Sequence, residues 1–165
     1  MTDRLPRIAV DTCVLLDLLV PVDAKRAERA EYLLDGHGSR HQVLLPAIVI
    51  PEIAGSGIVR GNDGGAQARK QRIADATEWI NGCAYRIAEL SARTARIASE
   101  LAIEHNLKGA DATVLATAQE WGCTRLYTRD GNLLECEGKL AVKVMEPEDP
   151  PAPEPDLFNT ADEAV

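Results

Sequence analysis

The sequence predicts a three-layer α/β/α fold with a mostly parallel central sheet. Short apolar runs rich in Val, Ile and Leu alternate with longer segments of helical periodicity, the order that right-handed β-α-β crossovers require. Hydrophobic residues make up 45% of the chain but aromatic residues only 4%, so we expect an aliphatic core. A length of 165 residues is typical of one domain.

The first predicted strand is Arg7–Val10, an apolar run near the N-terminus. A short helix is expected at Val14–Leu19, because Pro21 cannot continue it. A second helix is expected at Ala24–Leu34, where Gly36 follows as a stop signal.

The second predicted strand is Val43–Leu45, and a helix follows it. Pro51 is tolerated only in the first turn of a helix. This helix is therefore expected to begin near Val49 and to carry Glu52 at its start. The glycine-rich string GSGIVRGNDGG then predicts a turn.

The remaining elements continue the alternation, with Ser91 as the expected N-cap of one helix and Gly122 closing another. Helices are expected at Ala66–Ile80, Ser91–His105 and Asp111–Trp121. Strands are expected at Tyr85–Ala88, Thr124–Thr128 and Ala141–Met145.

The net charge of −8 is concentrated at the C-terminus. From Glu146 onward the chain holds seven acids and no Lys or Arg, which leaves 19 acids against 18 bases in the rest. We expect a folded body at residues 1–145 and a disordered, Pro-rich acidic tail at residues 146–165. The tail either keeps the protein soluble or competes with a polyanion for basic residues.

No stretch approaches the roughly 18 apolar residues of a membrane span, and the N-terminus lacks the apolar core of a signal peptide. We therefore expect a cytoplasmic protein with no membrane partner. His37 and His41 lie in a Gly/Ser-containing segment, which does not favour zinc. Reduced thiols are expected, without CxxC or zinc-ribbon spacing, at Cys13, Cys83, Cys123 and Cys136.

Four acidic residues stand where an apolar run meets a turn or helix: Asp11, Glu52, Asp111 and Asp130. Each alone has a structural explanation, as a helix cap, a first-turn acid or a turn residue. In a parallel sheet, however, all four collect at the carboxyl edge, where open α/β sheets place their sites. Crowded carboxylates raise one another's pKa unless a cation neutralises them.

This constellation predicts a metal site with catalytic use. Ligands that are oxygen only, without His or Cys companions, favour Mg²⁺ or Mn²⁺ over zinc. Such a site activates water and shields the charge of a phosphodiester under attack. Thr12 and Thr128 adjoin the acids, and their hydroxyls are expected to orient carboxylates. Asn132 is a candidate to hold a metal-bound water, or simply a turn residue.

Four strings in this order resemble the PIN-domain ribonuclease family, and within it the VapC-type toxins of bacterial toxin–antitoxin pairs. They are DTCVLLDLL, PAIVIPEI, GADATVLATAQEWGC and LYTRDGNLL. The similarity spans residues 7 to about 145 and excludes the acidic tail. It implies a PIN-like nuclease domain at residues 1–145.

The resemblance implies an Mg²⁺- or Mn²⁺-dependent endoribonuclease whose metal ligands are the four acids named above. It also implies a homodimer and a small antitoxin protein that covers the acidic pocket. Two positions depart from the family pattern. Cys13 stands where an Asn is common, and Asn132 stands where many members have a second Asp.

RNA binding requires Lys or Arg near the acids. The densest basic cluster follows Glu52, and one further arginine adjoins Asp130. The candidate RNA contacts are Arg60, Arg69, Lys70, Arg72 and Arg129. A solvated helical face explains the cluster equally well.

Other functions fit the same pattern less completely. A housekeeping RNA-processing nuclease would have the same chemistry, and the sequence does not separate it from a toxin. A catalytically silent binding module would not need all four acids. A dehalogenase-like domain has a second Asp where Cys13 stands, and a receiver-like domain has a late strand-end Lys that is absent here.

Overall fold

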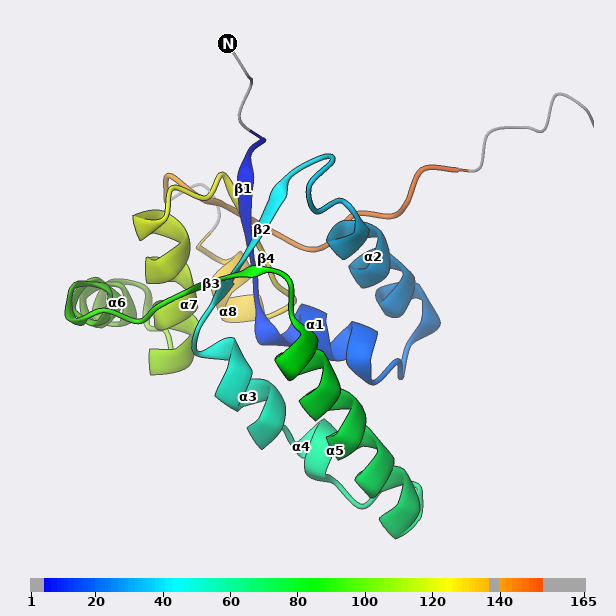
Figure 1. Ribbon diagram of the computed structural model, residues 1–165. Coiled ribbons are helices and arrows are strands. Elements are labelled where there is room, and N and C mark those ends of the chain that lie inside the picture. The colour runs from blue at the N-terminus through cyan, green and yellow to red at the C-terminus, as the bar shows by residue number, and fades with distance from the viewer. Residues whose placement is uncertain (1–4, 137–139, 153–165) are drawn as a thin grey trace, which may run out of the picture.

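The computed structural model describes residues 5–136 and 140–152 (Figure 1). Its centre is a five-stranded sheet in which every neighbouring pair is parallel, in the order β3-β2-β1-β4-β5. The strands are β1 Arg7–Val10, β2 Gln42–Pro46, β3 Arg86–Ala88, β4 Arg125–Tyr127 and β5 Lys143–Met145. This architecture confirms the predicted α/β class and the parallel sheet.

Helices cover both faces of the sheet. In Figure 1, α6 and α7 lie on one side of the strands, and α1 and α2 lie on the other. The segment α3–α5 extends beyond the end of the sheet where β1 runs out (Figure 1). The helices are α1 Thr12–Leu19, α2 Ala24–Asp35, α3 Val49–Gly55, α4 Gly57–Arg60, α5 Gly65–Gly82, α6 Ala92–His105, α7 Gly109–Glu120 and α8 Gly131–Leu134.

Strand order makes the boundary between β1 and β4 the switch point of the sheet. The chain moves from β1 outward to β2 and β3, and later returns to place β4 on the other side of β1. The backbone N–H of Asp11 donates to the Tyr127 carbonyl at 2.9 Å, so the two strands end side by side. Ligand sites of open α/β sheets lie outside the carboxyl ends of the strands at such a point.

The core is aliphatic, as the composition predicts. Ile8, Leu44 and Leu126 from three adjacent strands are fully buried, and Leu115 of α7 belongs to the same core cluster. The strands therefore read as continuous apolar runs, because helices bury both faces of the sheet. Tyr127 is the one aromatic residue among the buried core residues that the structure describes.

The structure confirms the predicted strands and long helices, with shifts of one or two residues at their ends. Ser91 caps α6 as expected, since its hydroxyl accepts from the Thr94 N–H at 3.0 Å. The predicted glycine-rich turn is wrong in part, because it contains one turn of helix, and a second short helix follows β4. The Ser56 hydroxyl caps α4 inside the glycine-rich string, and Asp130 caps α8.

The side chains outside the site behave largely as expected. Cys13, Cys83 and Cys123 are free thiols, and the Cys136 thiol donates to the Asn132 carbonyl at 3.3 Å. His37 and His41 make separate hydrogen bonds, to the Val43 N–H at 3.0 Å and the Leu33 carbonyl at 2.8 Å. No helix in the described part of the chain is long and apolar enough to cross a bilayer.

The beginning of the acidic tail lies against α2. Asp149 contacts Arg29 Nε at 2.6 Å and Lys25 Nζ at 3.7 Å, and Pro147 is buried. Asp149 and Lys25 are more than half exposed and Arg29 is partly exposed, so both ion pairs are open to solvent and contribute little stability. The remainder of the tail, residues 153–165, lies outside the described residues.

Candidate active site

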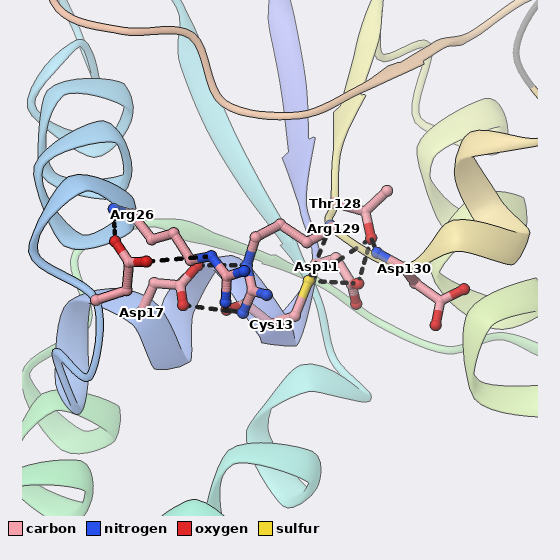
Figure 2. A network of polar contacts seen from close by, with 8 residues as sticks. Asp11, Cys13, Asp17, Arg26, Thr128, Arg129 and Asp130 are labelled. Atoms are coloured by element: carbon pink, nitrogen blue, oxygen red, sulfur yellow. Dashed lines mark hydrogen bonds and ion pairs between the residues drawn. The ribbon is translucent and has the colours of Figure 1, made fainter.

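All four acids predicted from the sequence line one cavity of about 370 Å³. The cavity lies at the carboxyl edge of the sheet, where β1 and β4 end (Figure 2). Its lining is Asp11, Thr12, Cys13, Leu16, Glu52, Asp111, Arg129 and Asp130. The predicted neighbours Thr128 and Asn132 are not part of the lining.

Asp11 is the most deeply buried of these acids, with 6% of its surface exposed. Its Oδ1 accepts from the Thr12 N–H at 2.7 Å and so caps α1. Its Oδ2 accepts from Thr128 Oγ1 at 2.7 Å and from Cys13 Sγ at 3.1 Å. The side chain therefore serves as a helix cap while it faces the cavity, and three donors offset the cost of burying its charge.

Glu52 enters the cavity from the first turn of α3. Thr12 Oγ1 donates to Glu52 Oε2 at 2.6 Å, and this bond joins the start of α1 to the start of α3. Thr12 thus holds one acid through its side chain and another through its backbone N–H. The two hydroxyls that the sequence places beside the acids, on Thr12 and Thr128, both bind carboxylates.

The surroundings of Asp111 raise its pKa. Burial, and then the negative charges of Asp130 and Asp11, raise its pKa from 3.8 to about 6. Among the described residues, its buried Oδ2 has no hydrogen-bond partner. Asp111 lies in the first turn of α7, whose N-cap is Lys108, so it is not itself a helix cap. A buried oxygen without a donor is costly to the fold and is available to a ligand.

Asp130 follows β4 and caps α8. Its Oδ1 accepts from the N–H groups of Asn132 at 2.9 Å and Leu133 at 3.3 Å. Its own N–H donates to Thr128 Oγ1 at 2.9 Å. Asn132 is exposed and contacts Asp130 through its backbone.

Cys13 has a role that its sequence position does not reveal. The thiol donates to Asp11 Oδ2 at 3.1 Å and accepts from the Arg129 N–H at 3.1 Å. Burial, and then the Asp11 charge, raise its pKa to about 12. Cys13 is thus a neutral hydrogen-bonding group at the position where the resemblance leads us to expect Asn.

Arg129 is held by Asp17, which is not among the site residues predicted from the sequence. Its guanidinium donates to Asp17 Oδ2 at 2.5 Å and Oδ1 at 2.9 Å, in a fork-shaped pair (Figure 2). It also donates to the Cys13 carbonyl at 3.2 Å. In the sequence, the only sign of this contact is that Cys13 and Asp17 lie one turn apart on α1. Their shared partner, Arg129, lies 112 residues from Asp17.

The predicted basic cluster divides into two pairs. Arg60 donates to the Gly55 carbonyl, and Arg72 donates to the carbonyls of Asp63 and Gly61, so these two hold the α3–α5 connection in place. Arg69 and Lys70 are exposed on α5 and line a separate cavity of about 200 Å³. None of these four residues lines the acidic cavity.

The donor set fits a hard divalent cation. The acidic cavity offers carboxylate oxygens and no imidazole, and one buried carboxylate oxygen lacks a partner. Within residues 5–136 and 140–152, no three His, Cys, Asp or Glu side chains already converge as a metal cluster. Mg²⁺ in proteins usually keeps several water molecules and takes only one or two carboxylates directly.

Comparison with known structures finds the same fold in several proteins, among them a toxin and a toxin–antitoxin complex. VapC20 of Mycobacterium tuberculosis, described as a toxin that cleaves the sarcin-ricin loop, is 22% identical, with a TM-score of 0.60 over 82% of this chain and 98% of that one. A toxin–antitoxin complex from Klebsiella pneumoniae is 22% identical, with a TM-score of 0.55 over 86% and 98%. FitAB bound to a DNA fragment is 24% identical, with a TM-score of 0.60 over 85% and 94%.

At these identities the structural likeness shows a shared fold. A sequence comparison with curated proteins finds no match. The family model named PIN domain, however, matches residues 8–139, which is most of the chain and includes every acid of the cavity. The chain belongs to the PIN-domain family.

Proposed function

We propose that this protein is a metal-dependent endoribonuclease that hydrolyses RNA phosphodiester bonds with Mg²⁺ or Mn²⁺, and that it is the toxin of a type II toxin–antitoxin pair. One observation carries the proposal. Four carboxylates from four separate segments line a single cavity at the switch point of the sheet. Burial, and then the charges of Asp130 and Asp11, raise the pKa of Asp111, and a cation bound beside it would favour its ionised form.

In this proposal Asp11, Glu52, Asp111 and Asp130 hold the cation. A bound Mg²⁺ or Mn²⁺ supplies positive charge for the phosphate group and makes water a better nucleophile. The chain's own residues keep the ligands in place. Thr12 orients Glu52, while Thr128 and Cys13 orient Asp11. Asp111 Oδ2, which has no donor, is the oxygen freest to bind.

The proposed partners follow from the family and its structural relatives. Two of the similar structures are a toxin–antitoxin complex and FitAB bound to DNA. We propose that a small antitoxin protein covers the acidic cavity, that the protein acts in the cytoplasm, and that it forms a homodimer. Light scattering of the purified protein tests the dimer, and co-purification with the product of a neighbouring small gene tests the antitoxin.

Cleavage of labelled RNA tests the chemistry. The wild type is expected to cut RNA with Mg²⁺ or Mn²⁺ and to stop in EDTA. Asp11→Asn and Asp111→Asn are expected to lose activity, since each removes a charge from the site. Asp35→Asn, at the exposed end of α2, is the matched control and is expected to keep full activity. Cleavage that survives EDTA or both site substitutions would overturn the metal mechanism.

Growth of cells that express the protein tests the toxin role. Induction of the wild type is expected to arrest growth, and Asp11→Asn is expected to relieve the arrest at equal expression. RNA cleavage in vitro without growth arrest would contradict the toxin role and leave the nuclease chemistry standing.

A further inference from the structure

The edge of the sheet opposite the acids is basic. Four of the five strands begin with an arginine or lysine: Arg7, Arg86, Arg125 and Lys143. At about 3.3 Å per residue, the steps from Arg7 to Asp11 separate the two edges by roughly 13 Å. The folded body is therefore nearly neutral overall, although the carboxyl edge of its sheet is acidic and the amino edge is basic.

Two of these arginines share one cavity. The cavity has a volume of about 270 Å³ and is lined by Leu5, Arg7, Gln42, Val43, Leu44 and Arg86. Strand register explains the pairing, because Arg7 lies beside Gln42 and Arg86 lies beside Leu44. Residues two apart on β2 face the same side of the sheet, so their partners Arg7 and Arg86 do as well.

Trp121, at the end of α7, positions both guanidinium groups. Its carbonyl accepts from Arg7 Nη1 at 3.0 Å, and its ring lies under the Arg86 guanidinium at 4.7 Å from ring centroid to Cζ. Neither arginine forms an ion pair with a carboxylate in the described residues. Guanidinium groups that are already held lose less freedom on binding, and their planar donors match phosphate oxygens.

The second arginine pair at this edge lies beside an acid of the tail. Arg40 and Arg125 line a cavity of about 140 Å³ together with Glu148. Arg125 pairs with Ile8 rather than Arg7 in the register, so its side chain faces the other side of the sheet. The tail thus lies beside one pair of arginines, while the described residues offer no carboxylate to the other.

We propose that Arg7 and Arg86, with the Gln42 amide beside them, bind a backbone phosphate of single-stranded RNA away from the acidic cavity. The choice of RNA as the ligand rests on the proposed function. RNA is a polyanion, and four carboxylates repel it, so RNA that reaches the acidic cavity needs positive charge elsewhere on the protein. Three of the RNA contacts predicted from the sequence already bind other groups of the protein: Arg60, Arg72 and Arg129. Arg7 and Arg86 meet this need.

RNA-binding affinity measured in EDTA tests the site. Fluorescence anisotropy with a long single-stranded RNA is recorded for full-length Asp11→Asn protein, alone and with added Arg86→Gln or Arg7→Gln/Arg86→Gln. Each lost phosphate contact is expected to weaken binding about fivefold at moderate salt and to reduce the salt slope by about 0.7. Arg86 is exposed, so the single variant tests the site without disturbing the core.

Arg96→Gln is the matched control, since Arg96 is exposed on α6, and it is expected to bind like the parent. Unchanged affinity and slope in both Arg86 variants, or no RNA binding by the parent, overturns the proposal. If the Arg86 variants bind inorganic phosphate more weakly but bind RNA as the parent does, the site takes phosphate and RNA is the wrong ligand. If wild type fails to cleave RNA while the Arg86 effect appears, the proposed nuclease fails and this site stands.

Discussion

At the scale of single residues, Asp11 shows how a buried carboxylate serves the fold and the proposed site together. It caps α1 through Oδ1 and receives Thr128 and Cys13 at Oδ2. Each donor offsets part of the cost of burying this carboxylate. Asp111 is the opposite case, because burial and neighbouring acids disfavour its charge and its Oδ2 receives no donor.

Removal of the Thr128 hydroxyl should destabilise the protein. Thr128 is fully buried, and its hydroxyl donates to Asp11 and accepts from the Asp130 N–H. Thr128→Val keeps the volume but leaves a buried donor and acceptor short of a partner, at an expected cost of about 1–3 kcal/mol in the free energy of unfolding. Urea unfolding measures it. Thr128→Ser retains the hydroxyl and should lose markedly less; equal losses in the two variants would contradict this role.

The raised pKa of Asp111 predicts how stability depends on pH without metal. Between the usual pKa of 3.8 and about 6, the folded protein holds a proton that the unfolded chain has released. The free energy of unfolding therefore falls as pH rises through this window. Relative to Asp111→Asn, wild type in EDTA should lose on the order of 1 kcal/mol of this free energy across the window, since solvent screens a partly exposed carboxyl. A wild-type-to-variant difference that stays constant across the window would refute it.

At the level of secondary structure, a bidentate ion pair joins α1 to the residue that follows Thr128 after β4. Asp17 on α1 and Arg129 after β4 are largely buried, with 14% and 24% of their side chains exposed. The pair, together with the Arg129 contacts to Cys13, fixes the element that carries Asp11 against the one that carries Asp130. The geometry between two acids of the site thus depends on packing outside it.

A double-mutant cycle measures the coupling energy of the Asp17–Arg129 pair. Asp17→Ala and Arg129→Ala are each expected to destabilise the protein, and their coupling energy from urea unfolding should be about 1–3 kcal/mol. The exposed pair Asp23–Arg26, separated by 3.9 Å, is the matched control and should couple by less than about 0.5 kcal/mol. Coupling of the buried pair no larger than that of the exposed pair would show that α1 is positioned by other contacts.

At the scale of the whole molecule, the sequence predicts the fold and the location of the four acids because both depend on strand ends. An apolar run that ends in an acid, as at Asp11, marks the carboxyl edge without knowledge of the register. The Asp17–Arg129 pair and the arginine cavity were missed because they depend on tertiary packing and strand register. The short helices α4 and α8 were missed because four residues in Gly-containing strings give no helical period.

The strand order then converts these local features into a molecule with two different edges. Asp11 and Asp130 meet at one edge because β1 and β4 are neighbours, although they lie far apart in the chain. The same parallel arrangement gathers Arg7 and Arg86 at the other edge. The claim on which the account depends is that the carboxylates of the first edge form one site for a divalent cation.

Titration of the metal-free protein with Mn²⁺, followed by the electron paramagnetic resonance of free Mn²⁺, tests that claim most directly. Wild type should bind Mn²⁺, and Asp11→Asn and Asp111→Asn should each weaken binding by at least about tenfold, since loss even of an outer partner of a metal ligand costs that much. Asp35→Asn should bind like wild type. Equal Mn²⁺ affinity in wild type and both site variants, or no binding by wild type, would contradict the account.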